Sequence, residues 1–285
     1  MGLCVCIGSI KMSFELEAFG LKDKIAIVTG GGSGIGEEIS KAYARAGAHV
    51  VLAARQQERL ERVAEDIRAL GRQSLAIATD VTEPDQIDQL LKKTVERFGR
   101  LDIMVANSGG GGFPSLDKAT LEDWQKQITL NLDSAFLCDV GAGKIMIEQG
   151  TGGRIINISS TAGINLNPAL PAYAAAKAGM INFTKSLALT YARGNHSINV
   201  NCVAPGFTAT PAIRKAGYVP SDVRKDGTRV PPLLMPNEPR HVADACVFLA
   251  SEAASHVTGE LMAIRGMMHM EWSNDVTRDR AHLIK

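Results

Sequence analysis

The sequence predicts an α/β protein with a single domain, built on one doubly wound parallel sheet. Short apolar segments rich in β-branched residues alternate with amphipathic segments of helical period. The apolar segments are nearly continuous, which is typical of strands buried on both faces of a parallel sheet. A glycine-rich loop follows the first of them and opens a helical segment. Strand and helix in regular succession place helices on both faces of such a sheet.

Six predicted strands define the sheet. Each is an apolar run of strand length that is followed by a polar or helical segment. They are residues 24–29, 49–54, 73–79, 101–106, 154–159 and 197–203.

Amphipathic helices fill the intervals between these strands. Residues 35–46, 57–70 and 87–98 repeat apolar residues at helical spacing. In the second of these, Leu60, Val63, Ile67 and Leu70 share one face. Residues 210–240 have no clear period and many prolines, so we expect them to form a mobile segment that covers the substrate.

Composition narrows the class of function. The 285 residues suit one α/β domain, and 45% hydrophobic with 21% charged residues is typical of a soluble globular protein. With 31 basic and 30 acidic residues the net charge is +1, which gives no general attraction to nucleic acid or to an anionic membrane. Five cysteines without a C-x-x-C pair favour a reducing compartment. We therefore expect a cytoplasmic protein with a small-molecule partner.

The glycine-rich loop is the first functional motif. Thr29-Gly-Gly-Gly-Ser-Gly-Ile-Gly36 directly follows a predicted strand and opens a predicted helix. Such a loop lets the backbone approach a pyrophosphate, and the helix N-terminus offers free N–H groups to the phosphates. Strand-loop-helix context favours a Rossmann-type dinucleotide site over a glycine turn without a ligand.

The spacing T-G-x-x-x-G-x-G resembles the short-chain dehydrogenase/reductase family, and the resemblance extends over residues 23–266. It implies a family domain over 23–267, with an N-terminal extension over 1–22 and a C-terminal tail over 268–285. Much of the core is similar to the 3-oxoacyl-carrier-protein reductases. The cofactor-loop residues implied by the resemblance are Gly30, Ser33, Gly34, Ile35 and Gly36.

The end of the second strand indicates which nicotinamide is bound. A site selective for NAD places an acidic residue there for the ribose hydroxyls, whereas a 2′-phosphate favours arginine. Ala54 occupies that position and Arg55 follows it. Ser33 stands where NADP-binding relatives usually carry a second basic residue. The sequence thus predicts NADP(H), while Arg55 as a merely solvated charge remains the alternative.

The resemblance implies further cofactor contacts after the third, fourth and sixth strands. The fourth-strand loop departs from the family's N-N-A-G pattern at Ala106 and Ser108. The implied contacts are Asp80 and Val81 at the adenine, Asn107 and Gly109 in the fourth-strand loop, and Pro205, Gly206 and Thr210 at the nicotinamide.

The candidate catalytic groups begin with Tyr173 and Lys177, at i and i+4 on one helix face. A phenol near pKa 10 is a poor base at neutral pH unless a nearby positive charge favours its phenolate, and Lys177 can supply one. Ser160 lies thirteen positions before Tyr173, which is the family's spacing, and can donate a hydrogen bond to the substrate oxygen. The family's fourth residue, implied to hold a water that connects Lys177 to solvent, is Asn131.

The sequence indicates which segments contact the substrate, but it contains no motif for one particular substrate. No H-E-x-x-H motif or carboxylate cluster indicates a metal. Substrate contacts are expected from residues 110–114, 161–168 and 207–235, where the family resemblance is weakest. A basic rim for a carrier protein would draw on Arg193, Arg214 and Lys215.

Together these observations predict an NADP(H)-dependent oxidoreductase that moves a hydride between the nicotinamide and a ketone, a 3-oxoacyl group or a secondary alcohol, with Tyr173 as acid and base. An NAD-linked hydroxysteroid or other secondary-alcohol dehydrogenase is the second enzyme hypothesis. A catalytically silent nicotinamide sensor is the hypothesis from another class. Family analogy implies a homodimer or homotetramer.

Overall fold

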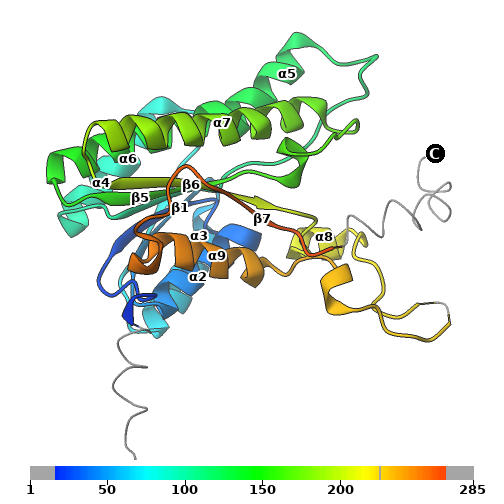
Figure 1. The fold of residues 1–285 in the computed structure, drawn as a ribbon, viewed down its shortest axis with the longest axis horizontal. Helices are drawn as coiled ribbons and strands as arrows, with labels where there is room; N and C mark the ends of the chain where they lie inside the picture. Colours follow the sequence, from blue (N-terminus) through cyan, green and yellow to red (C-terminus); the bar gives the residue numbers. More distant parts are fainter. Residues whose placement is uncertain (1–16, 225, 268–285) are drawn as a thin grey trace, which may run out of the picture.

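The sheet has seven parallel strands in the order β3-β2-β1-β4-β5-β6-β7. The computed structural model describes residues 17–224 and 226–267, so most of the predicted N-terminal extension and the whole tail lie outside the described residues. The predicted doubly wound fold is confirmed (Figure 1). The strands are β1 Ile25–Thr29, β2 His49–Ala54, β3 Ser74–Ala78, β4 Ile103–Ala106, β5 Gly153–Ile158, β6 Ile198–Pro205 and β7 Leu261–Ile264.

Helices cover both faces of the sheet (Figure 1). One face carries α2 Gly34–Arg45, α3 Gln57–Ala69 and α9 Pro239–Ala250. The other carries α4 Pro84–Phe98, α6 Ser134–Gln149 and α7 Pro171–Arg193, and α5 Leu121–Ile128 joins α6 through the π-helix Thr129–Asp133. Shorter elements are α8 Pro211–Lys215 and the 3-10 helices Thr161–Gly163, Pro232–Leu234 and Glu252–Ala254. None of the helices in the described part of the chain combines the length and apolar character needed to cross a bilayer.

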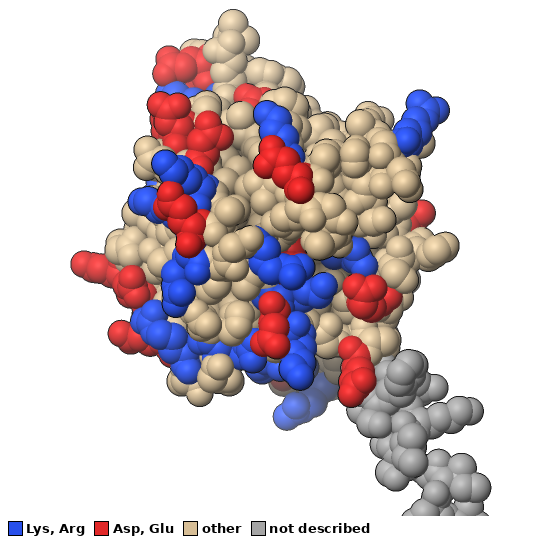
Figure 2. Space-filling model, turned by 90° about the vertical axis from the view of Figure 1, so that its left-hand side faces the viewer, with Lys and Arg blue, Asp and Glu red and all other residues tan. Residues whose placement is uncertain are grey.

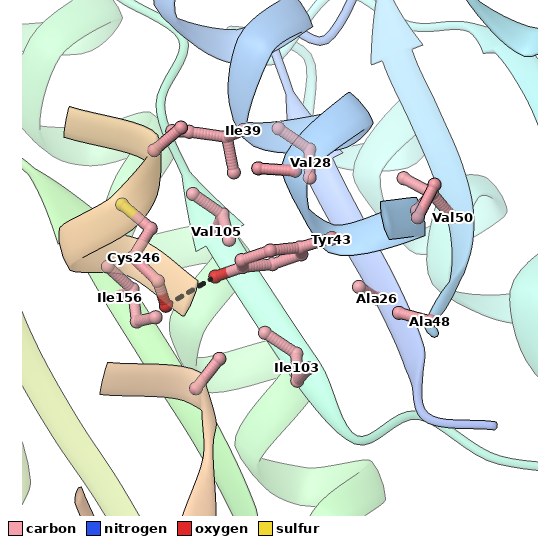
Figure 3. Close-up of a cluster of buried hydrophobic side chains, with 14 of the residues drawn as sticks. Ala26, Val28, Ile39, Tyr43, Ala48, Val50, Ile103, Val105, Ile156 and Cys246 are labelled. Carbon is pink, nitrogen blue, oxygen red and sulfur yellow. Dashed lines mark hydrogen bonds between the residues drawn. The ribbon is translucent and has the colours of Figure 1, made fainter. Parts of the chain in front are cut away.

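The core consists of two apolar clusters, one on each face of the sheet. Figure 3 shows part of the cluster beneath α2 and α9, where Tyr43 lies among apolar side chains of the sheet. Tyr43 is fully buried, and its hydroxyl donates a hydrogen bond to the carbonyl of Cys246 at 3.2 Å. This bond satisfies the buried hydroxyl, so α2 and α9 are held together without an unpaired polar group.

The strand order determines where along the carboxyl ends of the strands a ligand site can form. β1 pairs with both β2 and β4, so the chain leaves β1 in opposite directions across the sheet. In doubly wound sheets the crevice for a ligand opens at the carboxyl ends of the strands at such a reversal. The glycine loop after β1 and the Asn107 loop after β4 both lie there.

The opposite end of the sheet, at the amino ends of the strands, carries paired charges. Figure 2 shows the molecule from the left-hand side of Figure 1, and basic and acidic side chains are interspersed over this face. At the amino ends of the strands Arg154 pairs with Glu252 at 3.4 Å, and Arg72 pairs with Asp23. This mixture of charges is what the net charge of +1 leads one to expect.

A buried carboxyl group lies between α6, β5 and α7. Asp139 of α6 is fully buried, and its Oδ2 accepts a hydrogen bond from Asn157 Nδ2 at 2.7 Å. The same amide donates to Thr184 Oγ1 at 3.0 Å. Within the described residues, Asp139 Oδ1 and Asn157 Oδ1 have no partner. Burial raises the pKa of Asp139 to about 8, against the opposing effect of the Asn157 hydrogen bond.

We expect Asp139→Asn to increase the free energy of unfolding, and the gain to grow as pH rises from about 4 to 8. The folded pKa of Asp139 lies above its unfolded value, so the wild type loses stability as pH rises through this window, by up to about 1.4 kcal/mol per pH unit. Asparagine does not titrate and brings a donor for Asn157 Oδ1. Urea unfolding at pH 5, 7 and 9 measures the difference, with the exposed Asp88→Asn as control. Parallel pH profiles for Asp139→Asn and wild type would contradict this account.

Candidate active site

The glycine loop connects β1 to α2 through a tight turn. Gly30 has a φ of +67°, a conformation that favours glycine, and its N–H donates to the carbonyl of Ala53 at 2.7 Å. Gly36 approaches Gly30 so closely that a Cβ at position 36 would lie 2.3 Å from the Gly30 carbonyl oxygen. The N-terminus of α2 begins within this loop, which leaves its first N–H groups available to an anion.

The loop after β4 is fastened to the glycine loop. Asn107 Nδ2 donates to the carbonyl of Thr29 at 2.8 Å. The backbone N–H groups of Asn107 and Ser108 both donate to Thr29 Oγ1, at 2.9 and 3.0 Å. The departure at Ser108 therefore leaves this anchoring intact, since Ser108 contributes its backbone rather than its side chain.

The sequence-predicted acid and base pair lies on the first turns of α7. Tyr173 is partly exposed, whereas Lys177 is 2% exposed, and the Lys177 ammonium lies 5.8 Å from the centre of the Tyr173 ring. Burial raises the pKa of Tyr173, and a hydrogen bond with the side chain of Ser160 lowers it in part. Burial lowers the pKa of Lys177 to about 8. At neutral pH the phenol thus keeps its proton, and Lys177 is mostly charged.

Ser160 and α7 are held in register by the segment that follows β5. Ser160 Oγ accepts a hydrogen bond from the N–H of Ala162 at 3.1 Å, and its side chain also hydrogen-bonds Tyr173. Ser159 Oγ donates to the carbonyl of Lys177 at 2.8 Å, and Lys177 Nζ donates to the carbonyl of Ile158 at 2.8 Å. These crossed bonds fix the end of β5 against the helix that carries Tyr173.

Asn131 lies in the π-helix and is fully buried. Its Oδ1 accepts from the N–H of Gly110 at 3.0 Å, and its Nδ2 donates to the carbonyl of Gly110 at 3.1 Å. The same Nδ2 contacts Gln127 Oε1 at 3.2 Å, and Gln127 Nε2 donates to the carbonyl of Gly112 at 2.9 Å. The Asn131 amide therefore clamps the glycine segment 110–112, and Gln127 is a partner that the sequence analysis missed.

We expect Gln127→Leu to raise the KM for substrate and to lower stability by about 1–3 kcal/mol. The substitution removes the donor of the Gly112 carbonyl, so the glycine segment loses one of its two anchors. It also removes the Gln127 Oε1 contact of Asn131 Nδ2, which keeps the carbonyls of Gly110 and Gln127 as acceptors. Steady-state kinetics and chemical unfolding measure the two effects. Gln125→Leu, an exposed position on the same helix, is the matched control. Equal KM values for both variants would show that substrate binding does not depend on the contact between Gln127 and the glycine segment 110–112.

A cleft of about 1110 Å³ brings most of the predicted site together. A smaller hollow of about 560 Å³ beside the edge strand β3 contains none of the predicted residues. The sequence-predicted residues that line the large cleft are Gly30, Ser33, Gly34, Ile35, Gly36, Asn107, Gly109, Ser160, Tyr173, Lys177, Pro205, Gly206 and Thr210.

Three predicted cofactor residues do not line the cleft. Val81 is buried in the apolar cluster next to α4. The Asp80 carboxylate accepts hydrogen bonds from the N–H and hydroxyl of Thr82, at 3.0 and 2.7 Å, and these bonds lower its pKa. Arg55 is exposed just beyond β2. Instead, Arg59 and Arg62 of α3, which the sequence analysis did not single out, line the cleft beside the glycine loop.

The segment after β6 forms the opposite wall. Thr210 Oγ1 accepts from the N–H of Ile213 at 3.4 Å and caps α8, and a Cβ built at Gly34 would lie 3.4 Å from Thr210 Cγ2. Of the proposed basic rim, Lys215 lines the cleft, and Arg214 pairs with Glu238 at 2.5 Å. Arg193 does not belong to this rim, because it ends α7 about 30 Å along the helix from Tyr173.

The sequence matches a known protein family and several of its members. Residues 24–218 match the model of the short chain dehydrogenase family. A 3-oxoacyl-[acyl-carrier-protein] reductase of Synechocystis is 38% identical over 252 residues, covering 88% of this chain and 98% of the relative. A 3alpha-hydroxysteroid dehydrogenase of Mediterraneibacter gnavus is 37% identical over 248 residues, covering 86% and 97%.

A solved structure shows the same architecture with ligands present. It is a 7 alpha-hydroxysteroid dehydrogenase complexed with NADH and 7-oxo glycochenodeoxycholic acid, at a TM-score of 0.77 and 30% identity. The likeness covers 88% of this chain and 96% of that chain. These relatives act on different carbonyl and alcohol compounds, so their names do not converge on one substrate.

Proposed function

The chain belongs to the short-chain dehydrogenase/reductase family of NAD(P)-dependent oxidoreductases that act on CH–OH groups, and we propose that it is an NADP(H)-dependent member with Tyr173 as proton donor and acceptor. Its substrate in this proposal is a ketone or 3-oxoacyl group, or the corresponding secondary alcohol. One observation carries the proposal: Tyr173, Lys177 and Ser160 line the same cleft as the glycine loop.

The residues of the cleft fit a dinucleotide. Glycines let the backbone approach closely, and the first turn of α2 offers N–H groups to phosphates. Among the described residues that line the cleft, the one carboxylate is that of Glu37, and Arg62 and Lys41 both pair with it, at 2.7 and 2.8 Å. The positive side chains of the cleft are therefore not offset by a free negative charge, which suits a polyanionic ligand.

The bound cofactor supplies or accepts the hydride at its nicotinamide. The chain's own residues handle the proton. In reduction the Tyr173 hydroxyl gives its proton to the carbonyl oxygen while the Ser160 hydroxyl donates a hydrogen bond to the same oxygen. In oxidation the Tyr173 phenolate takes the proton from the alcohol, so the raised pKa of Tyr173 makes this direction favour alkaline pH.

Lys177 stabilises the phenolate of Tyr173 after the proton has left. Its ammonium lies close to the phenol ring and is excluded from bulk water, which strengthens the interaction between the two charges. Asn131 acts in this proposal through the Gly110 backbone, which it holds beside Lys177. A Cβ at Gly109 would lie 3.2 Å from Lys177 Nζ, so this loop borders the lysine directly.

Of the two rival functions, the NAD-linked dehydrogenase has observations in its favour. The hydroxysteroid dehydrogenase relatives, one of them bound to NADH, support an NAD-linked alcohol dehydrogenase. A silent sensor keeps the cofactor cleft but has no use for the Tyr173, Lys177 and Ser160 arrangement. We further propose a cytoplasmic location and assembly as a homodimer or homotetramer. The half-exposed Phe136 and Leu189 on α6 and α7 support the assembly.

The proposal is tested by titrating the purified chain with NADPH and with NADH while nicotinamide fluorescence is followed. Ketones and 3-oxoacyl thioesters are then screened with the cofactor that binds more tightly. Tighter binding of NADPH, followed by turnover, is the expected result. Tighter binding of NADH would favour the NAD-linked alternative, and binding without turnover of any carbonyl or alcohol would favour the sensor.

A further inference from the structure

We propose that Arg59, in the first turn of α3, is the residue that binds the 2′-phosphate of NADP(H) and selects it over NAD(H). This inference rests on the proposed NADP(H) preference. In it, Arg59 takes the place of Arg55 as the main contact of the 2′-phosphate. Arg59 follows the carboxyl end of β2, where a dinucleotide site reads the adenosine ribose. It carries a charge of the kind that a phosphate requires, but four residues later than the sequence analysis expected.

Arg59 packs directly on the glycine loop. A Cβ built at Gly32 would lie 3.3 Å from Arg59 Cβ, so the start of α3 and the loop are in van der Waals contact. Arg59 lines the cleft together with Gly32 and Ser33. The missing basic residue at position 33 is therefore replaced in space by an arginine from the neighbouring helix.

Arg55 lies on another side of this region. It does not belong to the described lining of the cleft, and its positive charge contributes to the lowered pKa of Asp80. The Asp80 carboxylate is already bound to Thr82. Arg55 thus lies near the β3 loop, whereas Arg59 lies near the loop that would hold the pyrophosphate.

The charge of Arg59 is available, in contrast to that of Arg62. Arg62 donates to both carboxylate oxygens of Glu37, at 2.9 and 2.7 Å. The Arg59 side chain is exposed and has no hydrogen bond or ion pair with any residue that the structure describes. A guanidinium binds a phosphate through two parallel N–H donors, so a free arginine beside the ribose position is well suited to this group. Arg62 contributes indirectly, because it neutralises a carboxylate that would repel the phosphate.

Two fragments separate this contact from the rest of the cofactor site. Adenosine 2′,5′-bisphosphate carries the 2′-phosphate, and adenosine 5′-monophosphate does not. Isothermal titration of the full chain is expected to show tighter binding of the bisphosphate, and Arg59→Gln should weaken that binding about 10- to 100-fold while the monophosphate binds as before. Arg68→Gln, on the same helix and paired with Glu61, is the matched control and should change neither value.

The outcomes distinguish this inference from the proposed function. If the wild type binds both fragments equally, the NADP(H) preference itself fails. If the wild type discriminates and Arg59→Gln does so equally well, the preference stands and the role of Arg59 is overturned, with Arg55→Gln as the next variant to lose discrimination. Equal weakening of both fragments by Arg59→Gln would also overturn the inference, since it would indicate a general effect on the loop. Unchanged thermal unfolding midpoints show that each variant is folded.

Discussion

Replacing Tyr173 by phenylalanine is expected to lower kcat/KM by about 10²- to 10⁴-fold in both directions of the reaction. The substitution removes one hydroxyl and keeps the ring, so the contact with Lys177 and the packing of α7 remain. The reacting oxygen then has no proton donor in reduction and no acceptor in oxidation. The dissociation constant of the nicotinamide cofactor should stay within about twofold, because the glycine loop is untouched.

Tyr191→Phe is the matched control for this variant. Tyr191 lies on the same helix, about 27 Å along it from Tyr173 and outside the cleft, so the loss of its hydroxyl should leave kcat/KM unchanged. Stopped-flow measurement of a single turnover separates the chemical step from cofactor release. If Tyr173→Phe retained wild-type turnover on a competent substrate, another group would have to carry the proton, and the proposed mechanism would be wrong.

The sheet could be predicted from the sequence because burial on both faces leaves an unbroken apolar pattern. The pattern indicates burial rather than hydrogen bonding, and this explains where predicted ends were wrong. Leu101 is fully buried, but its N–H and carbonyl bind the Gln149 side chain at 2.7 and 2.9 Å, so β4 begins at Ile103. Leu70 has the helical spacing of a buried residue, yet it is 46% exposed because α3 ends at Ala69.

The candidate site could be predicted only where its residues are close in sequence or follow a family spacing. Tyr173 and Lys177 share a helix face through their i, i+4 spacing. Arg59 meets the glycine loop across 27 positions, and only the packing of α3 on that loop reveals the contact. Gln127 belongs to a short, mostly polar helix without a distinctive pattern, so its buried contact with Asn131 had no counterpart in the sequence.

Residues 210–240 show a different limit of sequence analysis. Prolines interrupt any period there, and the helices among the described residues of 211–234 are α8 and the 3-10 helix Pro232–Leu234. The absence of a pattern did indicate irregular structure. It could not indicate that Thr210 lies against Gly34 on the far side of the cleft, because that contact depends on the path of the chain after β6.

Replacing Gly36 by alanine is expected to abolish tight cofactor binding, with a rise of about 100-fold or more in the dissociation constant, and to lower stability by about 1–3 kcal/mol. The added Cβ would lie 2.3 Å from the Gly30 carbonyl oxygen and 2.5 Å from Asn107 Nδ2. The first of these is backbone, so no change of rotamer relieves the contact. Either the glycine loop or the start of α2 must move, and the second neighbour couples that movement to the loop after β4.

Gly71→Ala separates this steric effect from the general cost of replacing a glycine. Gly71 has a φ of +77° and open space around the position of a Cβ, so alanine is strained there without meeting a neighbour. That variant should lose stability by about 1 kcal/mol and bind the cofactor normally. Wild-type cofactor affinity in Gly36→Ala would show that the pyrophosphate does not depend on this loop. Loss of affinity in Gly36→Ala at temperatures where it is fully folded would instead locate the dinucleotide at the junction of β1 and α2.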